Sequence, residues 1–328
     1  MFLCNNKNAE LIAKEAESRG IGVTSFPELS KVIIRFTKGS HREFIAESGT
    51  DLLGVATYKI FVNKALTDNL LREGGFPVPD EVVTDDIMEA ESFLRGQEKV
   101  VVKPLNLTWG KGVTTNITTS EQLEEAFKMA RSQLHGARAA SEKVMCQQQI
   151  EGEEYRVLVV NQKEVFAAQR IPAHVLGDGQ ATVAELIERL NSDAPDSRKI
   201  IIESQMVGIL KNQGVQPEAV PHEGRRIWLR QVANAHAGGT VFDATDSLGE
   251  EARKKAIEVA KYFNVPVVGI DCITFDLNKS LGCIIELNGT PDITLHHNPT
   301  QGESRDVAKA IVDMLFPETV DCIDGEEK

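Results

Sequence analysis

The chain has 328 residues, of which 41% are hydrophobic and 26% charged, as expected of a soluble globular protein with a core large enough for about two domains. Its formal net charge of -13 argues against nonspecific nucleic-acid binding, which needs a basic surface. No apolar run approaches the roughly 18 residues of a membrane span, and the first residues lack the apolar stretch of a signal peptide. We therefore expect a cytoplasmic protein with neither nucleic-acid nor membrane partners.

The five cysteines contain no CxxC pair, so the sequence indicates neither a disulfide framework nor a zinc site. The N-terminal residues have helical spacing over 8–19, ending at Gly20, and β-type runs come next at 23–26, 32–37 and 42–45. We expect residues 1–60 to form a small α/β region packed on the rest of the chain.

The next stretch carries two lysines at element boundaries. Lys64 opens a short predicted helix over 63–71, and Lys103 lies near the end of the strand 100–104. A loop with Gly110, Lys111 and Gly112 comes after this strand, and such glycines let backbone N–H groups approach phosphates closely. The alternative is a surface hairpin with a solvated lysine. Neither a P-loop nor a GxGxxG motif occurs.

The middle of the chain alternates predicted helices and strands. A helix over 120–134 shows an apolar stripe, and two strands in 144–160 are broken at Gly152. Glu154, just after the break, could accept hydrogen bonds from ribose hydroxyls, although a surface salt bridge to Arg156 is the alternative. A strand over 165–171 carries Arg170, a helix is expected over 183–191, and residues 193–222 are interpreted as an inserted subregion with a helix over 200–213.

The last third begins with a predicted strand that bears Arg230 and runs into Gly238 and Gly239, a second place where backbone could approach a ligand. Helices are expected over 250–263 and 306–315. The residues after Pro317 are interpreted as a frayed acidic tail.

Residues 267–291 form the strongest chemical candidate, because two apolar runs flank a polar, Gly-containing turn and predict a hairpin. With the turn centred between residues 278 and 279, Asp271 lies opposite Glu286, and Asn288 shares the face of Glu286. Two carboxylates and an amide oxygen are hard ligands that suit Mg²⁺ or Mn²⁺. The alternative is an ordinary solvated strand face.

These segments together resemble the ATP-grasp superfamily, through VVVKP with its glycine loop, EGEEYR, and the GID…IELN strand pair. LREGGFPVP, RIPAHVLGDGQATVAELI, FDATD and VDMLFP are similar to the ATP-grasp domain of cyanophycin synthetase and of bifunctional glutathione synthetase. The resemblance implies an α+β, ATP-grasp fold over residues 61–317. An ATP-lid sub-domain is expected at about 64–150 and a metal-binding sub-domain at 151–317, the latter with an insertion at about 174–225. Residues 318–328 are expected to follow this domain as a tail.

The resemblance also implies roles for individual residues. Asp271, Glu286 and Asn288 match metal ligands, and Glu154 matches a ribose-binding carboxylate. Arg170, Arg230 and Lys103 are the expected catalytic residues, with Gly238, Gly239, His296 and Arg305 as substrate candidates. The expected ATP contacts are Lys64, Lys103, Gly110, Lys111, Gly112 and the hinge residues Gln147, Gln149 and Ile150.

The implied activity is ATP-dependent amide formation through an acyl phosphate, with an amino acid, dipeptide or peptide terminus as substrate, Mg²⁺ as cofactor and a homodimer or homotetramer as assembly. Gly269 departs from D-alanine:D-alanine ligases, which place an arginine there, and the loop 292–297 has residues of its own. Two alternatives stay open: a small-molecule kinase of the same fold, and a nucleotide-binding partner subunit without catalysis.

Overall fold

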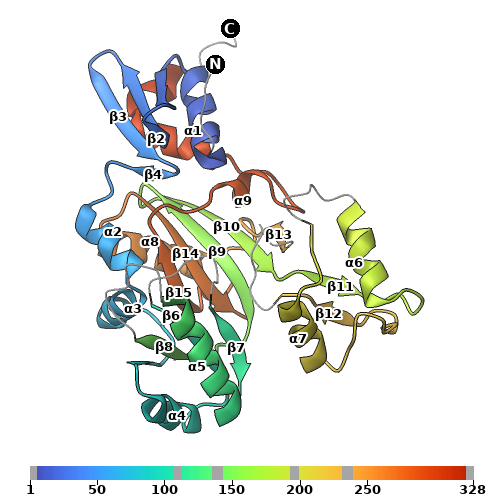
Figure 1. Cartoon of the computed structure of the whole chain (residues 1–328). Coiled ribbons are helices and arrows are strands. Elements are labelled where there is room, and N and C mark those ends of the chain that lie inside the picture. Colours follow the sequence, from blue (N-terminus) through green and yellow to red (C-terminus); the bar gives the residue numbers. More distant parts are fainter. Residues whose placement is uncertain (1–5, 106–111, 135–142, 193–198, 231–238, 323–328) are drawn as a thin grey trace. The chain divides into compact units, whose positions relative to one another are not determined.

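The computed structural model describes residues 6–105, 112–134, 143–192, 199–230 and 239–322. The chain divides into two compact units, and Figure 1 labels their helices and strands. One comprises residues 1–79, 150–169 and 242–328, and the other residues 80–149 and 170–241. Within the described residues no helix is long and apolar enough to cross a membrane. Cys146 and Cys272 are buried and Cys283 is half-buried, and none of these three described cysteines forms a disulfide.

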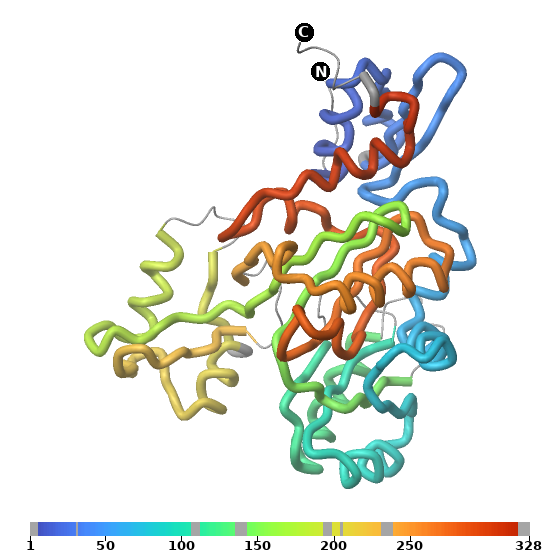
Figure 2. The backbone as a smooth tube through the Cα atoms, turned by 180° about the vertical axis from the view of Figure 1, so that it is seen from behind, coloured from blue at the N-terminus to red at the C-terminus, as the bar shows by residue number. Residues whose placement is uncertain are grey.

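In the first unit, the N-terminal region is a four-stranded antiparallel sheet in the order β1-β2-β3-β4 with a helix against it. Its elements are α1 (Lys7–Ser18), β1 (Gly22–Phe26), β2 (Ser30–Lys38), β3 (His41–Ala46) and β4 (Gly49–Thr50). The buried face of α1 shares one hydrophobic cluster with the last α-helix, α10 (Val307–Leu315). Figure 2 shows these two helices side by side, in blue and red. The helix and the three longer strands confirm the sequence prediction.

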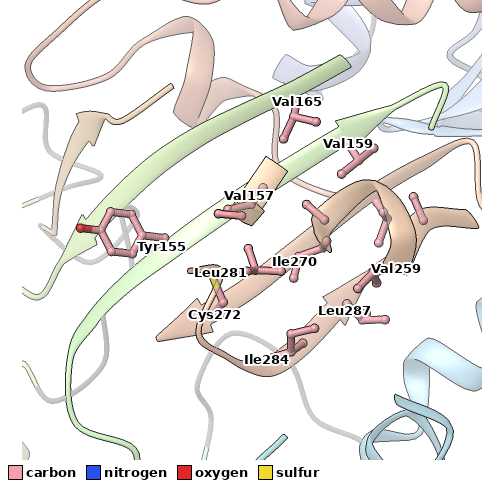
Figure 3. Close-up of a cluster of buried hydrophobic side chains, with 14 of the residues drawn as sticks. Tyr155, Val157, Val159, Val165, Val259, Ile270, Cys272, Leu281, Ile284 and Leu287 are labelled. Carbon is pink, nitrogen blue, oxygen red and sulfur yellow. The ribbon is translucent and has the colours of Figure 1, made fainter. Parts of the chain in front are cut away.

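A five-stranded sheet, in the order β13-β10-β9-β14-β15, forms the centre of the first unit, except that the last two residues of β10 and the first two of β13 fall in the second unit. Its strands are β9 (Glu153–Val160), β10 (Glu164–Ile171), β13 (Thr240–Asp243), β14 (Val267–Thr274) and β15 (Cys283–Asn288). The helix α8 (Glu250–Tyr262) contributes Ala252, Ala256 and Val259 to the core on one face of this sheet. Figure 3 shows this core, with Val157, Val159 and Ile270 pointing into it. Because side chains alternate along a strand, the residues between them lie on the other face.

The hairpin of β14 and β15 is present, and Asp271 pairs with Glu286 as predicted. Beyond that pair the register shifts by one residue, so that Cys272 lies opposite Ile284 rather than Ile285. The predicted turn centre was therefore wrong, because a β-bulge inserts one extra residue on β15 between the turn and the site. The residues farther from the turn keep the predicted alignment, and Gly269 pairs with Asn288.

Two helices connect the N-terminal sheet to the rest of the chain. The predicted helix is present as α3 (Lys64–Glu73), capped by Asn63, whose side chain accepts a hydrogen bond from the Leu66 backbone. The preceding α2 (Val55–Val62) was not predicted, because VATYKIFV is rich in β-branched and aromatic residues that favour strands. Only Phe61 of α2 is fully buried, while Val55 and Tyr58 are exposed.

The end of the chain is more ordered than a frayed tail. Residues 317–322 form a 3-10 helix, η3 (Pro317–Cys322), and Thr319 is fully buried and accepts a hydrogen bond from Arg19. The prediction of a tail from residue 318 was therefore wrong for this segment, because Thr319 is buried, accepts a hydrogen bond from Arg19 and donates one to the Phe316 carbonyl.

In the second unit, residues 80–149 form a four-stranded sheet in the order β5-β8-β6-β7, with two helices. The elements are β5 (Glu81–Thr84), α4 (Ile87–Arg95), β6 (Val100–Pro104), β7 (Thr114–Ile117), α5 (Ser120–Leu134) and β8 (Val144–Gln148). The predicted apolar stripe of α5 is entirely buried in the cluster between helices and sheet. The sequence analysis did not identify β5, α4 and β7, which are short.

Residues 170–241 of the second unit have a small core of their own. The elements are β11 (His174–Leu176), α6 (Val183–Ser192), α7 (Ser204–Asn212) and β12 (Arg226–Trp228), and β11 pairs with β12. The helices confirm the prediction for this segment. Arg230 lies two residues after β12 rather than within a strand, which corrects the predicted position.

Candidate functional site

A row of charged side chains crosses the second face of the central sheet in the first unit. Arg156 on β9 pairs in register with Asp271 on β14, and Asp271 pairs with Glu286 on β15. The three residues therefore share one face of three adjacent strands. Farther along the same face, Leu158 and Val267 join the core formed with α1 and α10. The charged row thus lies where that apolar covering ends.

Asp271 and Arg156 form a buried, bidentate ion pair. Arg156 donates from Nε to Oδ1 and from Nη2 to Oδ2 of Asp271, the second bond at 3.0 Å. Asp271 is 4% exposed and Arg156 7%. Arg156 is therefore not the surface partner of Glu154 that the sequence analysis considered, and that alternative was wrong. A buried charge needs such a partner, because an isolated one is strongly destabilising.

Glu286 has a cation of its own. Its Oε1 accepts a hydrogen bond of 2.9 Å from Nζ of Lys64, the first residue of α3. Lys64 is 8% exposed, although lysine is rarely buried without a carboxylate partner. Two residues predicted from distant parts of the sequence are thus in direct contact. We refer to Arg156, Asp271, Glu286 and Lys64 as the charged row.

The chemistry of the row's acidic end fits a divalent cation. Among the described residues no three His, Cys, Asp or Glu side chains are grouped so that they could hold a metal ion. The oxygen donors on this face would instead be the carboxylates of Asp271 and Glu286 and the amide of Asn288. Asn288 lies on the same face, and its buried Nδ2 has no hydrogen-bond partner within the described ranges. Two carboxylates and an amide oxygen on one sheet face form a hard, oxygen-only donor set.

His296 lies near the basic end of the row. It belongs to the four-residue helix α9 (Thr294–His297), and its ring centroid lies 6.3 Å from that of Phe166. The imidazole is 2% exposed, and neither ring nitrogen has a hydrogen-bond partner in the described part of the chain. Burial, with a further contribution from the positive charge of Arg156, lowers the pKa of His296 to about 3. The ring is therefore neutral at physiological pH.

The loop before α9 is held by local bonds. Asp292 accepts hydrogen bonds from the backbone and hydroxyl of Thr294, and the Ile293 backbone donates to Asn8 of the N-terminal region at 2.9 Å. This loop was expected to contact an acceptor substrate, and that role stays a prediction.

Arg305 is surrounded by carboxylates. It donates to Asp243 from Nε and Nη2, at 2.9 and 2.6 Å, and to Asp246 at 2.6 Å. Burial opposes ionisation of Asp243, but hydrogen bonds from Arg305 and Thr245 outweigh it and lower the pKa of that carboxyl. The structure thus gives Arg305 a clear structural role, and its contact with substrate stays a prediction.

In the second unit, the predicted Lys103 and Gln147 are in contact. Lys103 is 7% exposed and donates from Nζ to Oε1 of Gln147 at 2.8 Å, while Gln147 donates to Glu81 at 3.3 Å. These residues lie on the neighbouring strands β6, β8 and β5. The alternative of a solvated surface lysine is therefore wrong for Lys103, whose buried amine presents a point charge.

The hinge residues after β8 are tied to the sheet. The backbone N–H groups of Gln148 and Gln149 donate to the carbonyls of Asp80 and Lys99, at 2.8 and 3.0 Å. The Gln149 side chain exchanges two hydrogen bonds with Asn116. Ile150, the last predicted hinge residue, is half-buried and belongs to the first unit.

The other predicted residues lie on several elements. Glu154 is half-buried on the face of β9 that carries Arg156, opposite Ile273. Arg170 is half-buried in β10, and Gly239 precedes β13. Arg230 has a buried Nε without a hydrogen-bond partner among the described residues. Gly112 adopts a φ of 71°, which favours glycine. Gly110, Lys111 and Gly238 lie outside the described residues.

Arg156 is the residue of the row that sequence analysis did not assign to the site. One signal was available, since an arginine between the apolar residues of a β-strand needs a buried carboxylate. The identity of that carboxylate depended on the register of two strands more than 100 residues apart in sequence, Asp271 lying opposite Arg156.

Known proteins match the chain over most of its length. Residues 62–174 match the family model described as phosphoribosylglycinamide synthetase, ATP-grasp (A) domain. The chain is 34% identical over 325 residues to cyanophycin synthetase of Nostoc sp. strain PCC 7120, a match that covers 94% of this chain and 35% of the relative. It is 30% identical over 325 residues to the glutathione biosynthesis bifunctional protein GshAB of Listeria innocua, with 94% and 41% covered.

Among solved structures, the bifunctional glutathione synthetase from Pasteurella multocida matches with a TM-score of 0.67 and 26% identity, over 96% of this chain and 44% of that protein. The chain thus spans 35% to 41% of the length of the curated relatives named above. The matched domain, these relatives and the solved structure agree with the predicted resemblance, and the chain has an ATP-grasp fold like theirs.

Proposed function

We propose that the chain is an ATP-dependent carboxylate–amine ligase, which forms an amide or peptide bond through an acyl phosphate and releases ADP and phosphate. The observation that carries this proposal is the juxtaposition of Lys64, Glu286, Asp271 and Asn288 on one sheet face, since they are distant in sequence and combine a phosphate-binding cation with oxygen donors. The names of the relatives, cyanophycin synthetase and glutathione synthetase, support a reaction of this class.

In the proposed reaction, the protein acts mainly by positioning and by neutralising charge, which is what phosphoryl transfer requires. Lys64 and Lys103 are proposed to contact ATP phosphates, together with the loop of Gly110, Lys111 and Gly112. Held by Asp271, Glu286 and Asn288, Mg²⁺ or Mn²⁺ would supply further neutralisation of phosphate charge. Arg170 and Arg230 would orient the transferred phosphate or the substrate carboxylate through bidentate hydrogen bonds.

The remaining proposed contacts concern the nucleoside and the substrates. The hinge at Gln147, Gln149 and Ile150 would contact adenine, and Glu154 would accept hydrogen bonds from ribose. Gly238, Gly239, His296 and Arg305 stay substrate candidates. We propose an amino acid, a dipeptide or a peptide terminus as substrate, a homodimer or homotetramer as assembly and a cytoplasmic location. The domain boundaries predicted from the sequence are likewise retained as proposals.

The decisive experiment measures ADP release over pairs of amino acids and dipeptides. A ligase should release ADP only when the correct acid and amine are both present. Glu286→Gln and Lys103→Ala should reduce that release at least 100-fold, because the first removes a charged metal ligand and the second a positive charge at the reacting phosphates, an effect on the order of 10²–10³. Glu258→Gln and Lys128→Ala are matched controls on exposed helix surfaces, and they should retain wild-type rates.

Hydroxylamine distinguishes the ligase from the kinase alternative. An acyl phosphate gives a hydroxamate with hydroxylamine, whereas a stable phosphoester product would support a small-molecule kinase. Wild-type rates in folded Glu286→Gln and Lys103→Ala would refute the proposed site. Absence of ATP turnover with every pair, despite nucleotide binding, would favour the partner-subunit alternative.

A further inference from the structure

Arg156 occupies space that is open because residue 269 is a glycine. A Cβ atom placed on Gly269 would lie 3.1 Å from Cδ and 3.3 Å from Nη1 of Arg156, and 2.8 Å from Cβ of Pro291. Gly269 is adjacent to Asp271 on the same face of β14 and pairs with Leu158 of β9. The guanidinium of Arg156 therefore extends across the backbone of Gly269, and any side chain there would displace it or Pro291.

Both carboxylates of the charged row already have a positively charged partner. Arg156 binds both oxygens of Asp271, and Lys64 binds Glu286. The four side chains carry two positive and two negative formal charges. Arg156, Asp271 and Lys64 are each less than 10% exposed, so water screens these charges only weakly. A divalent cation arriving alone would have to compete with Arg156 and Lys64 for the same carboxylates.

Phosphate groups change that competition, because they offer both cations a new partner. Arginine binds phosphate oxygens with the same bidentate geometry that it uses for carboxylates. When phosphates arrive with the metal, Arg156 can exchange part of its interaction with Asp271 for an interaction with phosphate, and Asp271 becomes available as a metal ligand. The two ligands would thus favour each other's binding through one side chain.

We propose that Arg156, seated over Gly269, is the internal counter-ion of Asp271 and makes strong binding of a divalent cation depend on the presence of nucleotide phosphates. This inference rests on the proposed function, because it takes Asp271 as a metal ligand and ATP as the nucleotide. It assigns to Arg156 a positioning role toward Asp271. It also gives a physical reason for glycine at residue 269.

The experiment compares Mn²⁺ binding with and without ADP, using the electron paramagnetic resonance signal of free Mn²⁺, so that no turnover is needed. In the wild-type protein, ADP should lower the dissociation constant of Mn²⁺, and the ratio of the two constants is the coupling factor. Such factors are on the order of 5–150-fold for linked ligands. In Arg156→Met, Mn²⁺ alone should bind more tightly than to wild type, and the tightening by ADP should fall at least 5-fold. Calorimetric titration of ADP with and without Mn²⁺ should give the same coupling factor, because linkage is reciprocal.

A second pair of variants keeps the test valid if Arg156→Met does not fold. Arg156→Lys keeps the positive charge but loses the bidentate geometry, and it should give an intermediate coupling factor. Arg19→Lys is the matched control: Arg19 is also buried and pairs with Glu15 and Asp313, but it lies at the α1–α10 contact. It should leave the coupling factor unchanged. Circular dichroism checks that each variant is folded.

Two results would overturn the inference. If Arg156→Lys and Arg156→Met bind Mn²⁺ with wild-type affinity and retain the full ADP effect, Arg156 is a structural residue only. If Mn²⁺ alone binds more weakly to Arg156→Met than to wild type, Arg156 supports the metal ligand and does not compete for it. These outcomes leave the proposed ligase activity intact, whereas a wild-type protein that binds no ADP would overturn both proposals.

Discussion

The neutral, buried His296 predicts a specific loss of stability in mild acid. Its ring is 2% exposed and its pKa lies at about 3, against an ordinary value near 6.5. Because the folded-state pKa is lowered, the unfolded chain binds a proton that the folded chain excludes between these two values. The contribution of His296 to stability is therefore complete above pH 6.5 and declines as the pH falls toward 3.

The magnitude can be worked out from linkage. A pH of 5 is about 1.5 units below the pKa of the histidine in the unfolded chain. The free energy of unfolding is therefore about 2 kcal/mol lower at pH 5 than at pH 7.5. Other groups titrate in the same range, and they include His297, whose pKa is also lowered by burial. The informative quantity is thus the difference between wild type and His296→Gln, in which no imidazole can be protonated.

The assay is urea unfolding at pH 7.5 and pH 5.0. Wild type should lose about 2 kcal/mol more unfolding free energy between these pH values than His296→Gln does. His297→Gln serves as a control for the neighbouring imidazole and should retain most of the wild-type difference. If His296→Gln loses as much stability as wild type over this range, the charge on Arg156 and the burial of the ring do not keep His296 neutral, and the reasoning is refuted.

Three further predictions concern packing and ion pairing. Phe316 is fully buried and in edge contact with Phe36. Phe316→Ala should therefore lower the free energy of unfolding, measured with urea, by roughly 3–5 kcal/mol, and a loss below about 1 kcal/mol would contradict its place in the shared core. Asp243→Asn should lower stability by roughly 1.5–3 kcal/mol, because it weakens the charged hydrogen bonds from Arg305, and an unchanged melting temperature would contradict this contribution. Gly249→Ala should give less folded protein on expression, since its Cβ would collide with the Asn278 carbonyl oxygen, and normal yield with an unchanged melting temperature would refute that contact.

Local patterns in the sequence predicted many of the elements but could not predict how distant elements meet. The α5 stripe and the pairing of Asp271 with Glu286 follow from periods of 3.6 and 2, which are read within a short window. The helix α2 was missed because its burial pattern comes from packing against the central sheet, whereas its composition favours a strand.

The sequence predicted most of the residues of the site but few of the contacts between them. Lys64 and Glu286 were each identified, but their 2.9 Å contact depends on the placement of α3 beside β15. The bulge in β15 was not visible, since one extra residue in a strand leaves no local signature in this sequence. Arg156 was considered only in the alternative of a surface pair with Glu154, the nearest acidic residue in sequence.

The core shared by α1 and α10 has a consequence for the order in which the protein folds during synthesis. The apolar face of α1, with Ala9, Ile12 and Ala16, is covered in part by residues of α10 that are made almost 300 residues later. At a ribosomal rate of about 5–20 residues per second, this interval is on the order of 15–60 s. The N-terminal sheet and α1 can form early, but the part of the α1 face that α10 covers stays exposed until α10 is made. A nascent chain should therefore expose this face to chaperones throughout most of translation.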